Sequence, residues 1–106
     1  MATVHEVDAI RAKLEENLGP VIGSDLGAHL RRDAVFIVAD GHSLVACGVA
    51  IATDDSTSVA LWLADGTLRR PTADEREAWP VDESRQWNAV VVQPFVLVQD
   101  IAAENA

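Results

Sequence analysis

The sequence predicts a single small α+β domain, in which an antiparallel sheet of about four strands packs with about three or four short helices. Its length of 106 residues suits one hydrophobic core. Hydrophobic residues make up 49% and charged residues 24%, close to the average of globular proteins, so the whole chain, residues 1–106, is expected to form one domain. Amphipathic stretches with capping residues supply the helices, and apolar runs rich in Val and Ile supply the strands. The ends, about residues 1–3 and 102–106, are expected to fray.

Two helices are predicted in the first third of the chain. Thr3 and Glu6 have the spacing of a capping box, and apolar residues then recur at steps of three or four until Gly19-Pro20 ends the helix. A second, shorter helix is expected to begin at Ser24, which is a good N-cap residue, and to end near Arg32.

A hairpin of two buried strands is predicted next. Residues 34–39 are all apolar, residues 40–43 (Asp-Gly-His-Ser) supply a turn, and residues 44–52 resume the apolar run. Because neither strand has a polar face, we expect both faces of the sheet to be covered. A chain this short has few elements with which to cover two faces, so we expect self-association through the sheet, giving a homo-oligomer such as a dimer.

Residues 56–65 have helical apolar spacing, with Asp54-Asp55 before them and Gly66 where a C-terminal glycine would stand. The alternative is a strand over residues 59–64 that turns at Asp65-Gly66, and the helix is favoured.

The last third predicts one short helix and one long strand. Thr72 and Glu75 repeat the capping-box spacing ahead of a two-turn helix that Trp79-Pro80 closes. Residues 88–99 are the most strongly β-like in the chain. Proline lacks the amide that a central ladder needs, so a bulge, bend or edge position is expected at Gln93-Pro94.

The charge balance argues against several classes of partner. Eight Lys and Arg residues stand against 17 Asp and Glu residues, which leaves a net charge of −9 and no basic stretch to hold a phosphate backbone. We therefore expect neither nucleic acid nor a membrane as a partner. No signal-like segment and no run approaching ~18 apolar residues is visible, so the protein is predicted to be cytoplasmic.

No residue is predicted to be catalytic, and no metal or cofactor is expected. Cys47, the single thiol, lies within an apolar run, where burial raises a thiol pKa, so it is interpreted as structural. His5, His29 and His42 lack the short spacings of a zinc site, and His5 and His42 are expected to be solvated. There is no glycine-rich phosphate loop, no G-x-S-x-G elbow and no CxxC pair.

Four residues are candidates for ligand binding: His29, Arg32, Asp54 and Gln93. His29 could act as a base or ligand and Arg32 as an anion clamp, although cations at a helix end are ordinary and this structural interpretation is favoured. Asp54 belongs to a carboxylate pair for which helix capping is favoured. Gln93 is a polar group inside an apolar stretch, either satisfying a bulge or lining a pocket.

The three tryptophans supply most of the aromatic content. Trp62 is assigned to the core. Trp79 and Trp87 are left open between core and interface, because tryptophan fills small cores and is also enriched at binding hot spots.

Three sets of residues carry a resemblance to a known family: Asp25-Leu26 with His29 and Arg32-Asp33; residues 48–52 with Asp54, Val59, Trp62, Leu63, Leu68 and Arg70-Pro71; and residues 91–99, Val-Val-Gln-Pro-Phe-Val-Leu-Val-Gln, which are the most specific. Over nearly its whole length the chain resembles small bacterial proteins of unknown function. The aromatic residue that often precedes Asp-Leu in that family is replaced here by residues 22–24, Ile-Gly-Ser. The resemblance implies a bacterial cytoplasmic protein and supports the helix around Trp62, and it supplies no catalytic residue.

Two functional hypotheses follow. The first is a non-enzymatic, self-associating interaction module that presents an acidic surface to a protein partner. The alternative is a small-ligand-binding protein or minor enzyme with a pocket around the four candidate residues, which requires positions far apart in the sequence to converge.

Overall fold

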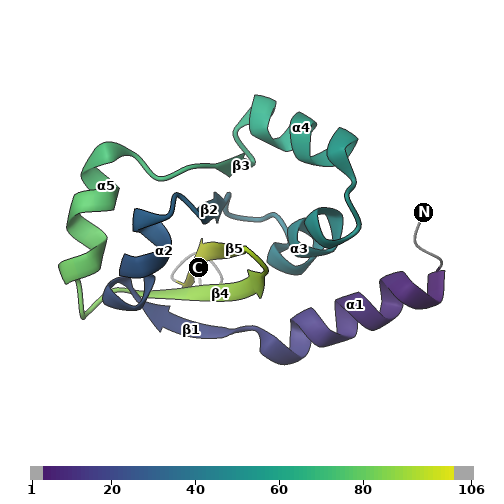
Figure 1. The fold of residues 1–106 in the computed structure, drawn as a ribbon, viewed down its shortest axis with the longest axis horizontal. Helices are drawn as coiled ribbons and strands as arrows, with labels where there is room; N and C mark the ends of the chain where they lie inside the picture. The colour runs from purple at the N-terminus through teal and green to yellow at the C-terminus, as the bar shows by residue number, and fades with distance from the viewer. Residues whose placement is uncertain (1–3, 102–106) are drawn as a thin grey trace.

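A five-stranded mixed sheet organises the computed structural model, which describes residues 4–101 (Figure 1). Within these residues the chain forms one α+β domain with five α-helices and two short 3-10 helices. In chain order the elements are α1 (Val4–Asn17), β1 (Gly19–Ile22), η1 (Gly23–Leu26), α2 (Gly27–Arg31), β2 (Val35–Val38), α3 (Leu44–Ala52), α4 (Ser56–Asp65), β3 (Leu68–Arg69), α5 (Ala73–Ala78), η2 (Trp79–Val81), β4 (Gln86–Val92) and β5 (Phe95–Asp100). The expected cap at Thr3 and the expected fraying at both ends lie outside the described residues.

The strand order is β1-β4-β5-β2-β3. The β1–β4, β4–β5 and β2–β3 pairs are antiparallel, whereas β2 and β5 are parallel, with Val35 opposite Val96 and Ile37 opposite Val98. The predicted α+β class is confirmed, but the purely antiparallel sheet of four strands is wrong. The long connection from β2 to β5, which carries three α-helices, η2 and the strands β3 and β4, allows these two strands to run parallel.

Helices of the same chain cover both faces of the sheet. Alternate residues of the central strands enter two separate core clusters: on β5, Leu97 joins the first cluster and Val96 and Val98 join the second. The first cluster also contains side chains from α1 and α3, and the second contains side chains from η1, α2 and η2. We call the face of the sheet that carries the first cluster the first face, and the opposite one the second face. Figure 1 shows α2 and α5 on one side of the sheet and α1, α3 and α4 on the other. The expectation that both faces are covered is confirmed, and the cover comes from within the chain.

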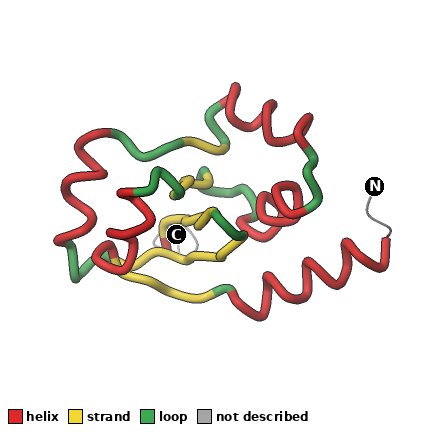
Figure 2. Tube along the Cα trace, in the orientation of Figure 1, coloured by secondary structure: helices red, strands yellow, loops and turns green. Residues whose placement is uncertain are grey.

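Residues 44–52 form helix α3 and not the second strand of a hairpin, as Figure 2 shows. The hydroxyl of Ser43 caps the helix by accepting a hydrogen bond of 3.0 Å from the Ala46 amide. The helix is apolar on nearly all sides because it lies between α1, α4 and the sheet, with Cys47 0% exposed. A continuous apolar run is compatible with a buried strand and with a buried helix. The strand predicted over residues 44–52 was wrong for this reason.

The single long strand predicted over residues 88–99 is in the structure a hairpin of two strands, β4 and β5. Gln93-Pro94, a cis peptide, forms the turn between β4 and β5, so proline occupies a position where no ladder amide is needed (Figure 2). The structure also adds the edge strand β1 directly after α1, where the sequence predicted only the end of a helix.

The remaining helices are close to those predicted. α4 confirms the favoured interpretation of residues 56–65, with the Asp55 carboxylate as its N-cap and Gly66 at φ +85° as its C-cap. Thr72 and Glu75 form the predicted capping box of α5. The second predicted helix begins as the 3-10 helix η1. Its first turn is stabilised not by the predicted N-cap Ser24 but by the Asp25 carboxylate, which accepts a hydrogen bond from the Ile22 amide at 3.1 Å.

Candidate functional site

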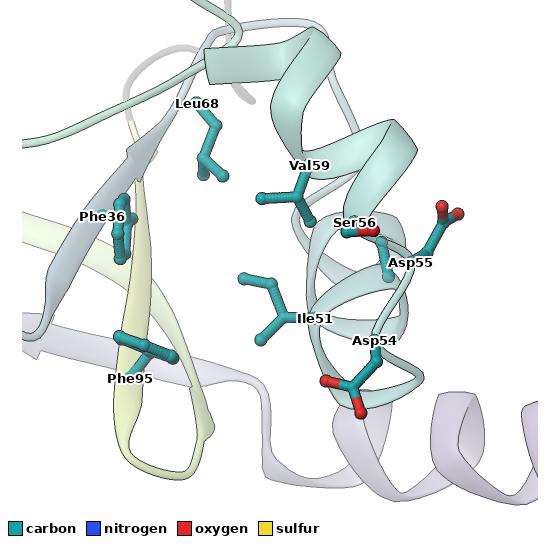
Figure 3. Close-up of a pocket in the computed structure, with 9 residues that line it drawn as sticks. Phe36, Ile51, Asp54, Asp55, Ser56, Val59, Leu68 and Phe95 are labelled. Atoms are coloured by element: carbon teal, nitrogen blue, oxygen red, sulfur yellow. The ribbon is translucent and has the colours of Figure 1, made fainter.

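An apolar cavity of about 250 Å³ lies between α4 and the first face of the sheet (Figure 3). It is lined by Phe36, Ala50, Ile51, Asp54, Asp55, Ser56, Val59, Leu68 and Phe95. Six of these side chains are hydrocarbon, and the three polar residues belong to the α3–α4 connection and the first residue of α4. The cavity is therefore a hydrophobic recess with a polar mouth.

The parallel strand pair forms one wall of this cavity. Phe36 of β2 and Phe95 of β5 meet edge to face, with ring centroids 5.5 Å apart and an interplanar angle of 70°. Leu68 of β3, which is 1% exposed, continues this wall. Ile51 near the end of α3 and Val59 in α4 face it, as Figure 3 shows. Three strands and two helices hold the recess, so its shape belongs to the fold and not to a single loop.

The two carboxylates at the mouth have different roles. Asp55 accepts hydrogen bonds from the Ser58 amide at 3.1 Å and the Ser58 hydroxyl at 2.7 Å, and these bonds lower the pKa of Asp55. The predicted capping role is thus confirmed for Asp55. Asp54 has a left-handed backbone, with φ +56°, and within residues 4–101 its carboxylate has no hydrogen-bond or ion-pair partner. In Figure 3 this carboxylate points toward the Phe95 side of the cavity, whereas the Asp55 carboxylate points away.

Helix α4 carries exposed leucines as well as apolar residues that pack inward. Val59 and Trp62 are half-buried against the first core cluster. Leu61 and Leu63 are 61% and 46% exposed, and no residue of α4 is fully buried. Because Leu61 and Leu63 are two residues apart, they lie on different sides of the helix, and Ser56, Thr57, Ser58 and Asp65 are also exposed or half-buried along it. We call the solvent-exposed part of α4, which carries both leucines, its outer side; it lies beside the cavity.

The four residues predicted to bind a ligand do not converge. His29 lies on α2 and Arg32 directly after it, on the second face of the sheet, and the Arg32 guanidinium donates to His29 Nδ1. Asp54 lies at the cavity mouth on the first face, and Gln93 is exposed in the β4–β5 turn. Neither His29, Arg32 nor Gln93 lines this cavity. A single pocket built from all four residues is therefore ruled out by their placement.

The two tryptophans left open between core and interface are core residues in this chain. Trp79 is 5% and Trp87 is 3% exposed, and their rings lie 4.5 Å apart in the second cluster. The Arg85 guanidinium covers the Trp87 ring at 4.1 Å. Trp79 and Trp87 therefore offer almost no surface to a partner, which corrects their assignment as a possible interface.

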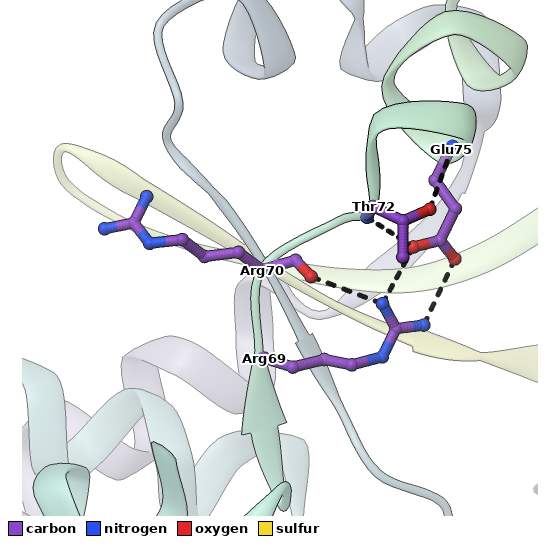
Figure 4. A network of polar contacts seen from close by, with 4 residues as sticks. All are labelled: Arg69, Arg70, Thr72 and Glu75. Carbon is purple, nitrogen blue, oxygen red and sulfur yellow. Dashed lines mark hydrogen bonds and ion pairs between the residues drawn. The ribbon is translucent and has the colours of Figure 1, made fainter. Parts of the chain in front are cut away.

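A polar network joins β3 to α5 on the second face (Figure 4). The Arg69 guanidinium donates to both oxygens of Glu75, at 2.7 Å and 3.1 Å, and to the Arg70 carbonyl at 3.3 Å. Glu75 also accepts from the Thr72 amide at 2.8 Å. The bond from Arg69 is the main cause that lowers the pKa of Glu75 from 4.5 to about 2. Since each group is already paired, the network positions α5 and is not an open binding site.

Cys47 and His42 complete the set of candidate groups. Burial raises the pKa of the Cys47 thiol from 9.0 to about 11, which confirms its structural interpretation. His42 is not solvated as predicted: it is half-buried, and its ring meets Trp62 edge to face at 4.9 Å. Residues 4–101 contain no group of three or more His, Cys, Asp or Glu side chains that could hold a metal ion.

Sequence reasoning missed the cavity and one buried polar residue. The residues that line the cavity come from segments spread over more than half of the chain, so no local spacing in the sequence predicts it. Gln99 is 4% exposed and donates to the carbonyls of Ala39 and His42, at 2.9 Å and 2.6 Å, which fixes the loop ahead of α3. The sequence signal for Gln99 was its position as a polar residue at the end of a β-like apolar run.

The fold and the cavity define a small α+β domain with a hydrophobic recess under a helix that carries exposed leucines. The chain belongs to the family described as "Protein of unknown function (DUF2288)", which it matches over residues 9–100. It is similar to the NMR solution structure of PA1075 from Pseudomonas aeruginosa, with 27% identity and a TM-score of 0.73 over 95% of this chain and 93% of that one. No curated protein matches this chain significantly. Among residues 4–101, no helix combines the length and the apolar character needed to cross a membrane.

Proposed function

We propose that this protein is a non-enzymatic interaction module that binds a partner protein through the outer side of α4 and the adjoining cavity. The observation that carries the proposal is the exposure of Leu61 and Leu63 on a helix whose inner side is already apolar. Surfaces of this kind mark binding sites, because burying exposed leucine surface against a partner is favourable.

The charge of the chain favours a basic partner over a second copy. The net charge is −9, and the ends of α4 carry Asp54, Asp55 and Asp65. Two copies that met through α4 would bring these carboxylates together, whereas a basic segment would be attracted to them. Self-association was expected because both sheet faces needed cover, and helices of the same chain now provide it. The dimer stays a prediction.

Affinity capture with matched variants tests the proposal. The bait is the full chain as wild type, as the double variant Leu61→Gln/Leu63→Gln, and as Val81→Gln, whose substituted residue is 81% exposed on η2 beyond the second face. Proteins captured from a lysate of the source organism are quantified by mass spectrometry. We expect a partner that wild type and Val81→Gln retain equally and the double variant loses at least ~10-fold.

Two results would contradict this function. Equal capture by all three baits would exclude α4 as the interface, provided that the circular dichroism of the double variant shows an intact fold. A wild-type dimer in sedimentation velocity that the double variant converts to a monomer would instead identify a second copy as the partner.

A further inference from the structure

The residues that line the cavity beside α4 indicate which side chains of a partner would fit there. We propose, on the basis of the function above, that the partner inserts an apolar side chain of about leucine or phenylalanine size into the cavity and places a neighbouring Lys or Arg cation against the Asp54 carboxylate.

The lining of the cavity sets the apolar part of this occupant. Phe36, Phe95 and Leu68 form one wall, and Ile51 and Val59 form the other, so the interior offers contacts mainly to hydrocarbon. Filling such a recess removes apolar surface from water and restores the dispersion contacts that its walls lack. A volume of about 250 Å³ admits one large apolar side chain and excludes a folded element.

Asp54 sets the charged part. Its left-handed backbone, φ +56°, is unfavourable for residues that have a Cβ atom, and a glycine would avoid this cost. Asp33, at φ +58°, has the same kind of backbone, but its carboxylate is used: it pairs with Arg70 at 2.7 Å and lies 3.8 Å from Arg76. Within the described part of the chain, the Asp54 carboxylate has no such role, although it lies at the mouth of a hydrophobic recess.

The other charges near the cavity are already engaged. The Asp55 carboxylate caps α4 through Ser58. The Arg70 guanidinium lies 4.8 Å from the centroid of the Phe36 ring, where it pairs with Asp33. Among the described residues that line the cavity, Asp54 is therefore the carboxylate available to an incoming cation, and the net charge of −9 attracts that cation from a distance.

Three probes of nearly equal size and shape separate the two parts of the occupant. They are 2-phenylethylamine, which carries a cation, 2-phenylethanol, which is neutral, and 3-phenylpropionate, which carries an anion. Each is titrated into the ¹⁵N-labelled full chain, and the amide signals of Ile51, Val59 and Leu68 report occupation of the cavity. We expect 2-phenylethylamine to bind about two- to fivefold more tightly than 2-phenylethanol, and 3-phenylpropionate to bind most weakly, since an exposed ion pair contributes a modest preference.

Two variants assign the preference to Asp54. Asp54→Asn keeps a side chain that tolerates the left-handed backbone and removes the charge, so the amine and the alcohol should then bind equally. Glu77→Gln removes the same charge from the exposed side of α5 and should leave the preference unchanged.

The outcomes distinguish this inference from the function on which it rests. If the amine and the alcohol bind wild type equally, the role of Asp54 is wrong, although the cavity still binds apolar groups. If none of the probes shifts the cavity signals, the inserted side chain is wrong as well. In both cases the capture experiment with Leu61→Gln/Leu63→Gln decides independently whether α4 is an interface.

Discussion

Replacing Glu75 with glutamine should destabilise the protein in a manner that depends on pH. The pKa of Glu75 is lowered from 4.5 to about 2. At ~1.36 kcal/mol for each pH unit, this difference corresponds to about 3 kcal/mol for a fully shielded pair. The Arg69 and Glu75 side chains are 45% and 24% exposed, so solvent screening reduces the expected loss for Glu75→Gln to about 1 kcal/mol at neutral pH. The glutamine can still accept from the Thr72 amide, so the substitution removes mainly the ion pair with Arg69.

The sign of the pH dependence follows from the lowered pKa. Above pH 4.5 the Glu75 carboxylate is charged in both the folded and the unfolded chain, and the ion pair contributes its full stabilisation. As the pH falls from 4.5 to about 2, the unfolded chain takes up the proton first, and the contribution is lost. The gap between wild type and Glu75→Gln should therefore narrow over this range.

Urea unfolding followed by tryptophan fluorescence measures this gap, because Trp79 and Trp87 lie in the second core cluster. Glu77→Gln, on the same helix but with an exposed side chain, is the matched control and should change the free energy of unfolding little at any pH. The reasoning fails if Glu75→Gln is no less stable than Glu77→Gln at neutral pH. It also fails if the deficit of Glu75→Gln is undiminished near pH 2.

Three further substitutions or reactions test the packing. Gly23→Ala should lower the free energy of unfolding, measured by thermal melts, by about 2 kcal/mol, because the new Cβ would lie 2.5 Å from the Trp79 carbonyl oxygen. The control is Gly19→Ala, whose Cβ would meet nothing within 4 Å and which should leave the stability nearly unchanged. Gln99→Leu should cost about 1–3 kcal/mol, since it removes the two hydrogen bonds to backbone carbonyls ahead of α3; a loss well below this in urea unfolding would contradict that role. Cys47 should not react with a thiol reagent such as Ellman's reagent in the native protein and should react fully in urea, and rapid native labelling would show that the thiol is accessible.

Local signals predicted the capped helices well and the buried elements poorly. The capping box at Thr72 and Glu75 and the glycine after α4 act within a few residues, so their outcome is contained in the local sequence. In residues 44–52, β-branched Val and Ile alternate with Ala and Gly, and either a strand or a helix buries such a run. The choice of a helix depends on its position against α1 and the sheet, which are tertiary contacts. The capping hydroxyl of Ser43 was the one local sign, and it lay inside a segment that also resembled a turn.

The candidate site was predicted in one residue out of four, and for a different chemistry. Asp54 is a candidate in the sequence as a member of the Asp54-Asp55 carboxylate pair, and the structure places it at the mouth of the recess. His29 and Arg32 are candidates because they are polar residues next to an apolar run, but α2 places them on the opposite face of the sheet. Polar residues beside apolar runs occur on both faces of a covered sheet, so this criterion cannot assign them to one pocket. The sequence places Phe36 and Ile51 in a predicted hairpin, Val59 in a predicted helix and Phe95 in the predicted last strand, and no local pattern indicates that a recess lies between them.

The architecture leaves few surfaces through which this protein can associate. The two faces of the sheet are covered by helices of the same chain. The edge strand β1 contains Pro20, which has no amide to offer, and the other edge, β3, has only two residues, so neither edge is suited to pairing with another strand. The outer side of α4 carries two of the exposed large apolar residues of the described chain, Leu61 and Leu63, and it is the one that lies beside the hydrophobic recess; the others are Val4, Leu18, Val81 and Val91. These features support the proposal that a partner binds at α4, and the carboxylates at the ends of the helix are the reason for proposing a basic one.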